Sequence, residues 1–278
     1  MTSKAGAMIR VGVTGASGRM GRTLIEFIGA AEDLALGAAV DRHDSPAVGR
    51  DAGEQAGRER AGVTVAPTVE EVIDDFDVMI DFSAPVATLG LLPALVKAGK
   101  KMVIGTTGFD ADGESRIAAA AERIALVKAP NMSVGVNVAF RLIDLAAGAL
   151  GDDVDVEVME VHHRHKVDAP SGTAVRMGEI LARALGRDLA RDAVYGRQGI
   201  TGARNAKTIG FSSLRGGDIV GDHTVLFAGS GERLEITHRS QSRANFAQGA
   251  LRACRFLMNR DCGLYDMQDV LGFNEPLR

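Results

Sequence analysis

Three glycines at intervals of three residues, Gly15, Gly18 and Gly21, constrain the fold of this chain more than any other feature. They follow the β-rich run 9–14 and precede residues 22–30, whose apolar side chains recur at helical spacing. Glycine permits a tight turn here and leaves bare the backbone N–H groups at the start of the helix, where a phosphate can bind. Strand, glycine turn and helix together predict the opening of a βαβ unit. The G-x-x-G-x-x-G spacing is a variant of the usual G-x-G-x-x-G.

An acidic residue further along supports a nucleotide-binding role. Asp41 lies twenty positions after Gly21, at the end of a second predicted strand over 34–40, where a carboxylate can accept hydrogen bonds from an adenine ribose. Arg42 follows it and could pair with a 2′-phosphate. Asp41 favours NAD and Arg42 favours NADP, so use of both cofactors stays open. The alternative is an ordinary glycine turn beside a solvated aspartate.

Short predicted strands alternate with predicted helices over roughly the first 130 residues. After 34–40, strands are expected at 63–66, 77–82, 102–105 and 124–127, and helices at 85–98, closed by Gly99, and at 112–122. Thr68 is expected to cap a further helical turn. This alternation predicts an α/β fold with a doubly wound parallel sheet. The turn 105–108 ends one strand, where ligands of such sheets gather, so it either lines a nicotinamide or is a plain turn with an N-capping threonine.

The pattern changes after residue 133 and indicates a second domain. A long apolar helix is expected at 134–150, a strand with one wet face at 154–161 and a helix at 173–185. Three further strands are expected, which look antiparallel and open-faced, and the last two form a hairpin: 208–214, 224–228 and 234–238. A final helix over 245–258 is expected to pack back on the first domain.

The densest group of chemically active side chains lies at 160–174. Five basic side chains occupy positions 162–166 in a protein with a net charge of −4, and a compact cationic patch attracts a small dianion. Ser171, Gly172 and Thr173 then open a helix, where hydroxyls and free N–H groups suit a carboxylate. Histidine titrates near neutral pH and can move protons. The segment therefore predicts a pocket for an acidic metabolite.

Three other interpretations of this segment stay open. His162, His163 and His165 could bind a metal, but no cysteine lies nearby and the spacing is not that of a helical metal pair. The segment could also be a solvated basic loop. A phosphate or nucleic-acid patch is disfavoured because aromatic residues make up only 4% of the chain, so no stacking platform is visible. A nucleic-acid-binding protein also normally has a basic footprint, whereas this chain has 36 acidic and 32 basic residues.

Composition limits the cellular setting. The two cysteines, Cys254 and Cys262, cannot supply a disulfide framework or a cysteine-based metal site, which favours the reducing cytoplasm. Residues 1–7 contain no apolar segment typical of a secretory signal. No run of 18 or more uncharged apolar residues occurs, so no membrane span is expected.

Four motifs together resemble the 4-hydroxy-tetrahydrodipicolinate reductase (dihydrodipicolinate reductase) family. They are the glycine loop 13–21, the turn 105–108, the segment 129–137 and the signature 160–174, which contains His-His-x-x-Lys-x-Asp-x-Pro-Ser-Gly-Thr. The resemblance extends from about residue 9 to 270, and the last motif is highly specific to the family.

The resemblance implies a fold, a reaction and an assembly. It implies a Rossmann-type dinucleotide-binding domain over 1–131 and 241–278, and a smaller α+β substrate and oligomerisation domain with an open mixed sheet over 132–240. The implied reaction transfers a hydride from NADH or NADPH to C4 of a cyclic dicarboxylate, with loss of water, in the diaminopimelate route to lysine. The implied assembly is a cytoplasmic homotetramer without nucleic-acid or membrane partners.

The resemblance also implies roles for individual residues. His162 would exchange a proton, Lys166 would donate one, and the substrate carboxylates would bind to His163, Gly172 and Thr173. The pyrophosphate would bind to Gly15, Ala16, Ser17, Gly18, Arg19 and Met20, the ribose to Asp41 and a 2′-phosphate to Arg42. The backbones of Gly105, Thr106 and Thr107 and of Ala129, Pro130, Asn131 and Met132 would flank the nicotinamide. No metal is implied. Several family members carry Glu in place of Asp41, which leaves the preference between NADH and NADPH open.

Two other functions fit the sequence less well. An aldehyde dehydrogenase with a thiol nucleophile fails because neither Cys254 nor Cys262 lies near a plausible site in the central region. A non-catalytic NAD(P)H-binding sensor would need no acid–base pair and would carry a basic DNA-binding helix, which the sequence does not display.

Overall fold

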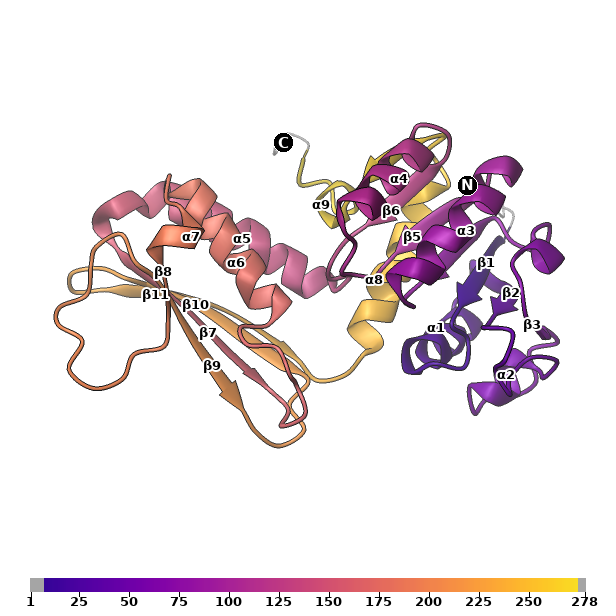
Figure 1. Cartoon of the computed structure of the whole chain (residues 1–278), viewed down its shortest axis with the longest axis horizontal. Coiled ribbons are helices and arrows are strands. Elements are labelled where there is room, and N and C mark those ends of the chain that lie inside the picture. The colour runs from indigo at the N-terminus through magenta and orange to yellow at the C-terminus, as the bar shows by residue number, and fades with distance from the viewer. Residues whose placement is uncertain (1–7, 275–278) are drawn as a thin grey trace, which may run out of the picture. The chain divides into compact units, whose positions relative to one another are not determined.

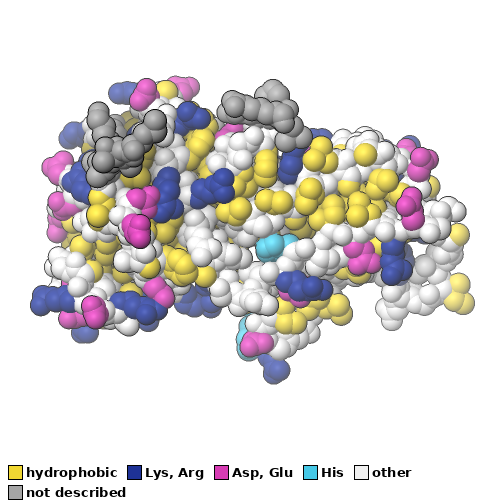
Figure 2. Space-filling model, turned by 180° about the vertical axis from the view of Figure 1, so that it is seen from behind, with side chains coloured by type: hydrophobic (Ala, Val, Ile, Leu, Met, Phe, Trp, Pro, Cys, Tyr) yellow, Lys and Arg dark blue, Asp and Glu magenta, His cyan; other side chains and the backbone are white. Residues whose placement is uncertain are grey.

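The computed structural model describes residues 8–274, which form two compact units (Figure 1). The first unit joins the chain up to Val134 with the chain from Ala244 onward, and the second comprises Gly135–Arg243. Residues 1–7, where no signal segment was expected, lie outside the described residues. On the face shown in Figure 2, acidic and basic side chains are interspersed.

A seven-stranded parallel sheet forms the centre of the first unit, in the order β12-β6-β5-β4-β1-β2-β3. Its strands are β1 (Ile9–Thr14), β2 (Leu34–Val40), β3 (Val65–Ala66), β4 (Val78–Asp81), β5 (Lys101–Ile104), β6 (Ala125–Lys128) and β12 (Gly263–Tyr265). The predicted doubly wound parallel sheet is confirmed. The edge strand β12 was not anticipated.

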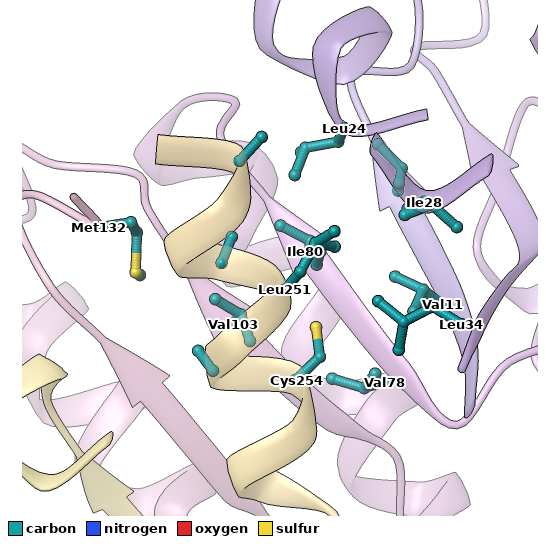
Figure 3. Close-up of a cluster of buried hydrophobic side chains, with 14 of the residues drawn as sticks. Val11, Leu24, Ile28, Leu34, Val78, Ile80, Val103, Met132, Leu251 and Cys254 are labelled. Atoms are coloured by element: carbon teal, nitrogen blue, oxygen red, sulfur yellow. The ribbon is translucent and has the colours of Figure 1, made fainter. Parts of the chain in front are cut away.

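Helices cover both faces of this sheet because its central strands are apolar on both sides. The helices are α1 (Arg19–Gly29), α2 (Ala52–Gln55), α3 (Pro85–Ala98), α4 (Ala111–Ala121), α8 (Ala244–Leu257) and α9 (Met267–Val270). Val103 of β5 joins the core beneath α1 and α8, whereas its neighbours Met102 and Ile104 join the core beneath α3 and α4. Figure 3 shows α8 crossing the sheet, with Leu251 and Cys254 among the strand side chains. Helix α8, expected over 245–258, therefore packs on the first unit, as predicted.

Local signals account for some of the helix boundaries. Pro85 occupies the first turn of α3, and Gly99 ends it in the left-handed region at φ 66°. The segment after β3 forms only a 3₁₀ turn (Glu70–Val72), whose N-cap is Val69, so the expectation for Thr68 was wrong. The Thr68 hydroxyl instead donates to the Glu71 carboxylate at 3.1 Å.

The second unit contains a five-stranded mixed sheet in the order β11-β10-β7-β9-β8. Its strands are β7 (Asp155–His162), β8 (Ala193–Tyr195), β9 (Ile209–Arg215), β10 (Gly221–Ala228) and β11 (Arg233–Ser240). Strand β10 runs antiparallel to β7 and β11, which confirms the predicted hairpin. Strand β9 runs parallel to β7 and β8, so the expectation of purely antiparallel strands was wrong, whereas the open mixed sheet is confirmed.

Two helices cover one face of the second sheet (Figure 1). The helices of this unit are α5 (Val134–Leu150), continued by a 3₁₀ turn (Gly151–Asp153), α6 (Gly172–Ala184) and the short α7 (Leu189–Asp192). The segment Val134–Asp153 is long and apolar enough to cross a membrane by length and composition alone. Its Phe140 and Ile143 nevertheless lie in the core with the strands, and its charged residues Arg141 and Asp144 form an ion pair at 3.3 Å. This arrangement is typical of the core helix of a globular domain.

Candidate active site

The glycine loop of the first unit has the geometry that an anion-binding turn requires. Gly15 adopts φ 60°, and its carbonyl oxygen accepts a hydrogen bond from Gly18 N–H at 2.9 Å. A Cβ at Gly21 would lie only 2.2 Å from that carbonyl oxygen, so a side chain there would disrupt the turn. Gly18 is the N-cap of α1, and no side chain among the described residues caps this helix or places an acid in its first turn. The first N–H groups of α1 therefore remain available to a phosphate.

The structure brings Asp41 to this loop. Its Oδ2 accepts a hydrogen bond from Ser17 N–H at 2.8 Å, and its Oδ1 accepts one from Arg42 N–H at 2.9 Å. Each carboxylate oxygen can accept a further bond, so a ribose hydroxyl can be added. The exposed Arg42 guanidinium pairs with Asp44 at 3.1 Å. The Asp41 carboxylate thus fixes the loop, while the Arg42 guanidinium takes part in a surface ion pair.

A buried carboxylate, Asp81, organises the strand ends beside the glycine loop. It is fully buried and accepts hydrogen bonds from Thr14 at the end of β1 (2.5 Å) and from Thr106 after β5 (3.0 Å). The hydroxyls of Ser83 and Thr88 donate to the same carboxylate. The side chain of Thr106 is therefore used inside the protein, and the backbone of its turn is what remains for a ligand. Sequence reasoning missed Asp81, although an acid ending an apolar strand was a usable signal.

The segment after β6 is tied into the first unit. Ala129 N–H donates to the Ile104 carbonyl at 3.2 Å, and Asn131 Oδ1 accepts from Ser133 N–H at 2.9 Å. Met132 lies in the core near α8 (Figure 3), where a Cβ at Gly249 would come 1.7 Å from its carbonyl oxygen. Pro130 and its neighbours thus follow directly from the carboxyl end of the sheet.

In the second unit, His162 ends β7 with its ring on the buried face. Its Nδ1 lies 2.5 Å from Oε2 of Glu160, a residue only 1% exposed. Burial lowers the pKa of His162, and the Glu160 carboxylate only partly opposes this, so the imidazole is neutral at neutral pH. The ring of His223 on β10 meets the His162 ring edge-on, with the centroids 5.0 Å apart.

The loop after β7 leads to the N-terminus of α6. The Lys166 ammonium pairs with the Asp168 carboxylate at 2.8 Å. Ser171 caps α6 by accepting a hydrogen bond from Ala174 N–H at 3.2 Å, which places Gly172 and Thr173 in the first turn. Ser171 Oγ also lies 2.9 Å from His223 Nε2, and burial lowers the pKa of His223 to about 3, so His223 is neutral.

The prediction of one compact cationic patch needs correction. His162 is buried against Glu160 and uncharged, and Lys166 is paired with Asp168, so two of the five basic groups contribute no free positive charge. His163 and His165 lie in the loop instead, with ring centroids 6.3 Å apart. The remaining positive charge therefore comes from fewer groups than the sequence suggested.

Three side chains of this unit that support the site, Glu160, Arg215 and His223, were given no role by the sequence analysis. Glu160, His162 and His223 present ligand atoms within 4.8 Å of one another, a grouping that could hold a metal ion. Arg215, however, donates to both oxygens of Glu160 at 2.8 and 2.9 Å, and a second cation beside a guanidinium is electrostatically unfavourable. The group is better described as a carboxylate–imidazole pair. Arg215 is 55 residues from Glu160, so no local signal joined them.

Comparison with known proteins decides the family. The description "Dihydrodipicolinate reductase, N-terminus" matches residues 9–132, and "Dihydrodipicolinate reductase, C-terminus" matches residues 135–271. The chain belongs to the dihydrodipicolinate reductase family. Relatives from Methylococcus capsulatus and Pseudomonas fluorescens, both named 4-hydroxy-tetrahydrodipicolinate reductase, are 56% and 57% identical over 265 residues. These alignments cover 95% of this chain and 98% and 99% of the relatives.

Solved structures agree with this assignment to the dihydrodipicolinate reductase family. The dipicolinate-bound dihydrodipicolinate reductase from Paenisporosarcina superposes with a TM-score of 0.76 at 25% identity, covering 94% of this chain and 99% of that one. A probable dehydrogenase from Thermotoga maritima, 14% identical with a TM-score of 0.61 and with 94% and 92% of the two chains covered, shares the fold alone. The resemblance drawn from the motifs is thereby confirmed, as is the expectation of a nicotinamide-dependent reductase. The roles of individual residues stay predictions.

Proposed function

We propose that the chain reduces 4-hydroxy-tetrahydrodipicolinate to tetrahydrodipicolinate in the diaminopimelate route to lysine, in the cytoplasm. The reaction consumes one NAD(P)H and one proton, and it releases water and NAD(P)⁺. One observation carries the proposal: β7 and the loop after it place His162 and Lys166, which can exchange protons, directly before the first turn of α6. The names of the relatives at 56% and 57% identity support the same substrate.

The domain predicted over 1–131 and 241–278, which overlaps the first unit, is proposed to bind the nucleotide. NADH or NADPH supplies the hydride when bound. The uncapped start of α1 would hold the pyrophosphate on the loop Gly15–Met20, Asp41 would bind the ribose, and Arg42 would take a 2′-phosphate. The backbones at 105–107 and 129–132 would flank the nicotinamide, because they continue the carboxyl ends of β5 and β6.

The domain predicted over 132–240, which overlaps the second unit, is proposed to bind the substrate dicarboxylate. The N–H groups of Gly172 and Thr173 in the first turn of α6 would bind one carboxylate, with His163 as a further donor. Hydride arrival at C4 builds negative charge on the conjugated ring, and a proton from Lys166 would neutralise it, while His162 exchanges a proton through its ring.

The outer face of the second sheet is proposed as the surface that forms a homotetramer. Register places Met159, Val161, Leu214 and Leu226 on this face, opposite the helices. Leu214 is 60% exposed, an apolar side chain that burial against another copy would stabilise. Sedimentation equilibrium tests this: a mass of one 29.2-kDa chain at micromolar concentration would contradict the tetramer.

The activity is tested by a coupled assay in which a synthase generates the substrate immediately before use. Oxidation of NADH and NADPH is followed separately, with NAD(P)H alone as the control. The expected result is substrate-dependent oxidation of at least one cofactor. Nucleotide binding without turnover would overturn the proposal and favour a non-catalytic sensor.

A further inference from the structure

A single guanidinium links the two groups that the proposed function uses for proton transfer. We propose that Arg215 and Glu160 are positioning residues that hold His162 and Lys166 in one hydrogen-bonded assembly. The inference rests on the proposed function for its catalytic meaning, but the assembly itself is a property of the second unit.

Arg215 reaches both sides of the assembly from the end of β9, where it is paired in register with His162. Its Nη1 and Nη2 donate to Oε2 and Oε1 of Glu160 at 2.9 and 2.8 Å. Its Nη2 also donates to the backbone carbonyl of Asp168 at 2.6 Å, and the Asp168 carboxylate pairs with Lys166. Displacing Arg215 would therefore release the supports of His162 and of Lys166 together.

The charge state of Glu160 decides which nitrogen of His162 is free. Burial raises the pKa of Glu160, but hydrogen bonds from Arg215, Ser213 and His162 outweigh burial and leave it below its usual range. An ionised Glu160 accepts the Nδ1–H of His162, which leaves Nε2 without a hydrogen and able to accept a proton. This is the arrangement in which a carboxylate fixes the tautomer of a catalytic imidazole.

Other charged groups also act on His162. Lys166 and Arg215 lower its pKa, and Glu160 is the acid that raises it. His223 on β10 faces the ring edge-on and is neutral, and Asp168 is engaged by Lys166. Removing the charge of Glu160 should therefore move the ionisation of His162 to lower pH.

The decisive experiment compares Glu160→Gln with Glu157→Gln in the full-length protein. Glu157 is a control because it lies on the same strand, on the opposite face, and is also paired with arginine: Glu160 binds one arginine, Arg215, and Glu157 binds two, Arg197 and Arg204. The first readout is the low-field proton NMR signal of His162 Nδ1–H in ligand-free protein, assigned by its loss in His162→Gln. The others are the pH titration of the His162 ring and the steady-state kinetics.

We expect Glu160→Gln to lose the low-field signal, to shift the titration to lower pH and to lower kcat about 10- to 100-fold with KM nearly unchanged. Glu157→Gln should leave all three readouts within about twofold. Arg215→Lys keeps the positive charge, but a lysine cannot donate to all the acceptors that Arg215 binds. We therefore expect this variant to change the low-field signal, the His162 titration and kcat in the same direction. It replaces Glu160→Gln in the test if that variant does not fold.

The inference is overturned if wild type lacks the signal, or if Glu160→Gln loses thermal stability while keeping the His162 titration and kcat. The NMR readouts need no substrate. A wild-type protein with the signal but without reductase activity would therefore contradict the proposed function and leave the assembly intact.

Discussion

The backbone of Gly221 lies against the ring of His162, so that a Cβ at this glycine would come 2.9 Å from Nε2. We expect Gly221→Ala to crowd the atom that exchanges a proton and to lower kcat about tenfold or more, since small displacements of a catalytic group are costly. Gly216→Ala is the control, because a Cβ at Gly216 meets nothing within 4 Å. Equal rates for the two variants would contradict a role for Nε2.

Lys166→Ala should lower kcat by about 100-fold or more, the usual scale for a positioned general acid. Its ammonium pairs with Asp168, so the loss of one ion pair should leave the fold intact. Steady-state kinetics and a thermal melt measure the two effects. Lys207→Ala, an exposed lysine of the same unit, controls for the loss of charge. A rate within a few-fold of wild type would remove Lys166 from the reaction.

Arg42→Ala should raise KM for NADPH more than for NADH, because only NADPH carries a 2′-phosphate. The reciprocal variant Asp44→Asn frees the Arg42 guanidinium from its partner at 3.1 Å and removes a charge that repels the phosphate. It should lower KM for NADPH by up to about fivefold, since an exposed ion pair is worth about 1 kcal/mol or less. Initial rates with both cofactors test the pair. Identical effects on NADH and NADPH would show that neither residue senses the phosphate.

Asp81→Asn should destabilise the protein by about 1–3 kcal/mol, because an amide replaces one buried acceptor with a donor among four hydroxyls. The substitution should also displace the turn that contains Thr106 and so lower the affinity for NADH, which fluorescence titration measures. Urea unfolding measures the free energy, and Asp33→Asn, at an exposed pair with Arg255, is the surface control. Unchanged NADH affinity would separate the buried cluster from the cofactor site.

Stability should decline as the pH falls below about 6.5. Burial lowers the pKa of His223 to about 3, so the unfolded chain binds a proton between these values while the folded chain does not. Stability therefore rises with pH across this window, by at most about 1.4 kcal/mol per unit for one histidine. His162 and His238 shift in the same direction. His223→Asn should flatten the slope of unfolding free energy between pH 5 and 7 measured in urea. An unchanged slope would show that the pH dependence of the unfolding free energy comes from other groups.

Local patterns predicted the elements whose ends carry their own signals. Helix α3 has Pro85 at its start and Gly99 at its end, and β2 is a continuous apolar run, so both were placed with their observed bounds. Strand β12 has three residues, which is too short for a hydrophobic period to be detected in the sequence. It forms because β6 offers an edge with which it can pair. Thr68 has capping chemistry, but its segment continues for only one 3₁₀ turn.

The candidate site was predictable where its residues are adjacent in sequence. The glycine loop and the segment from His162 to Thr173 each lie within one stretch of chain, whereas the groups that hold them come from elsewhere. Arg215 meets Glu160 across 55 residues, and Asp81 meets Thr14 across 67. Such pairings follow from strand order, which hydrophobic pattern does not specify.

The first unit is built from both ends of the chain, since α8 covers the core beneath α1 and β12 completes the edge beside β6. A nascent chain that has emerged only as far as residue 243 would leave Leu24, Ile28 and Val103 without the helix that seals them from water. Ribosomes must therefore translate the whole intervening unit before the nucleotide half can close. A chain that terminates before Ala244 would expose these apolar side chains to water. It would be prone to aggregate and would not form a functional nucleotide-binding unit.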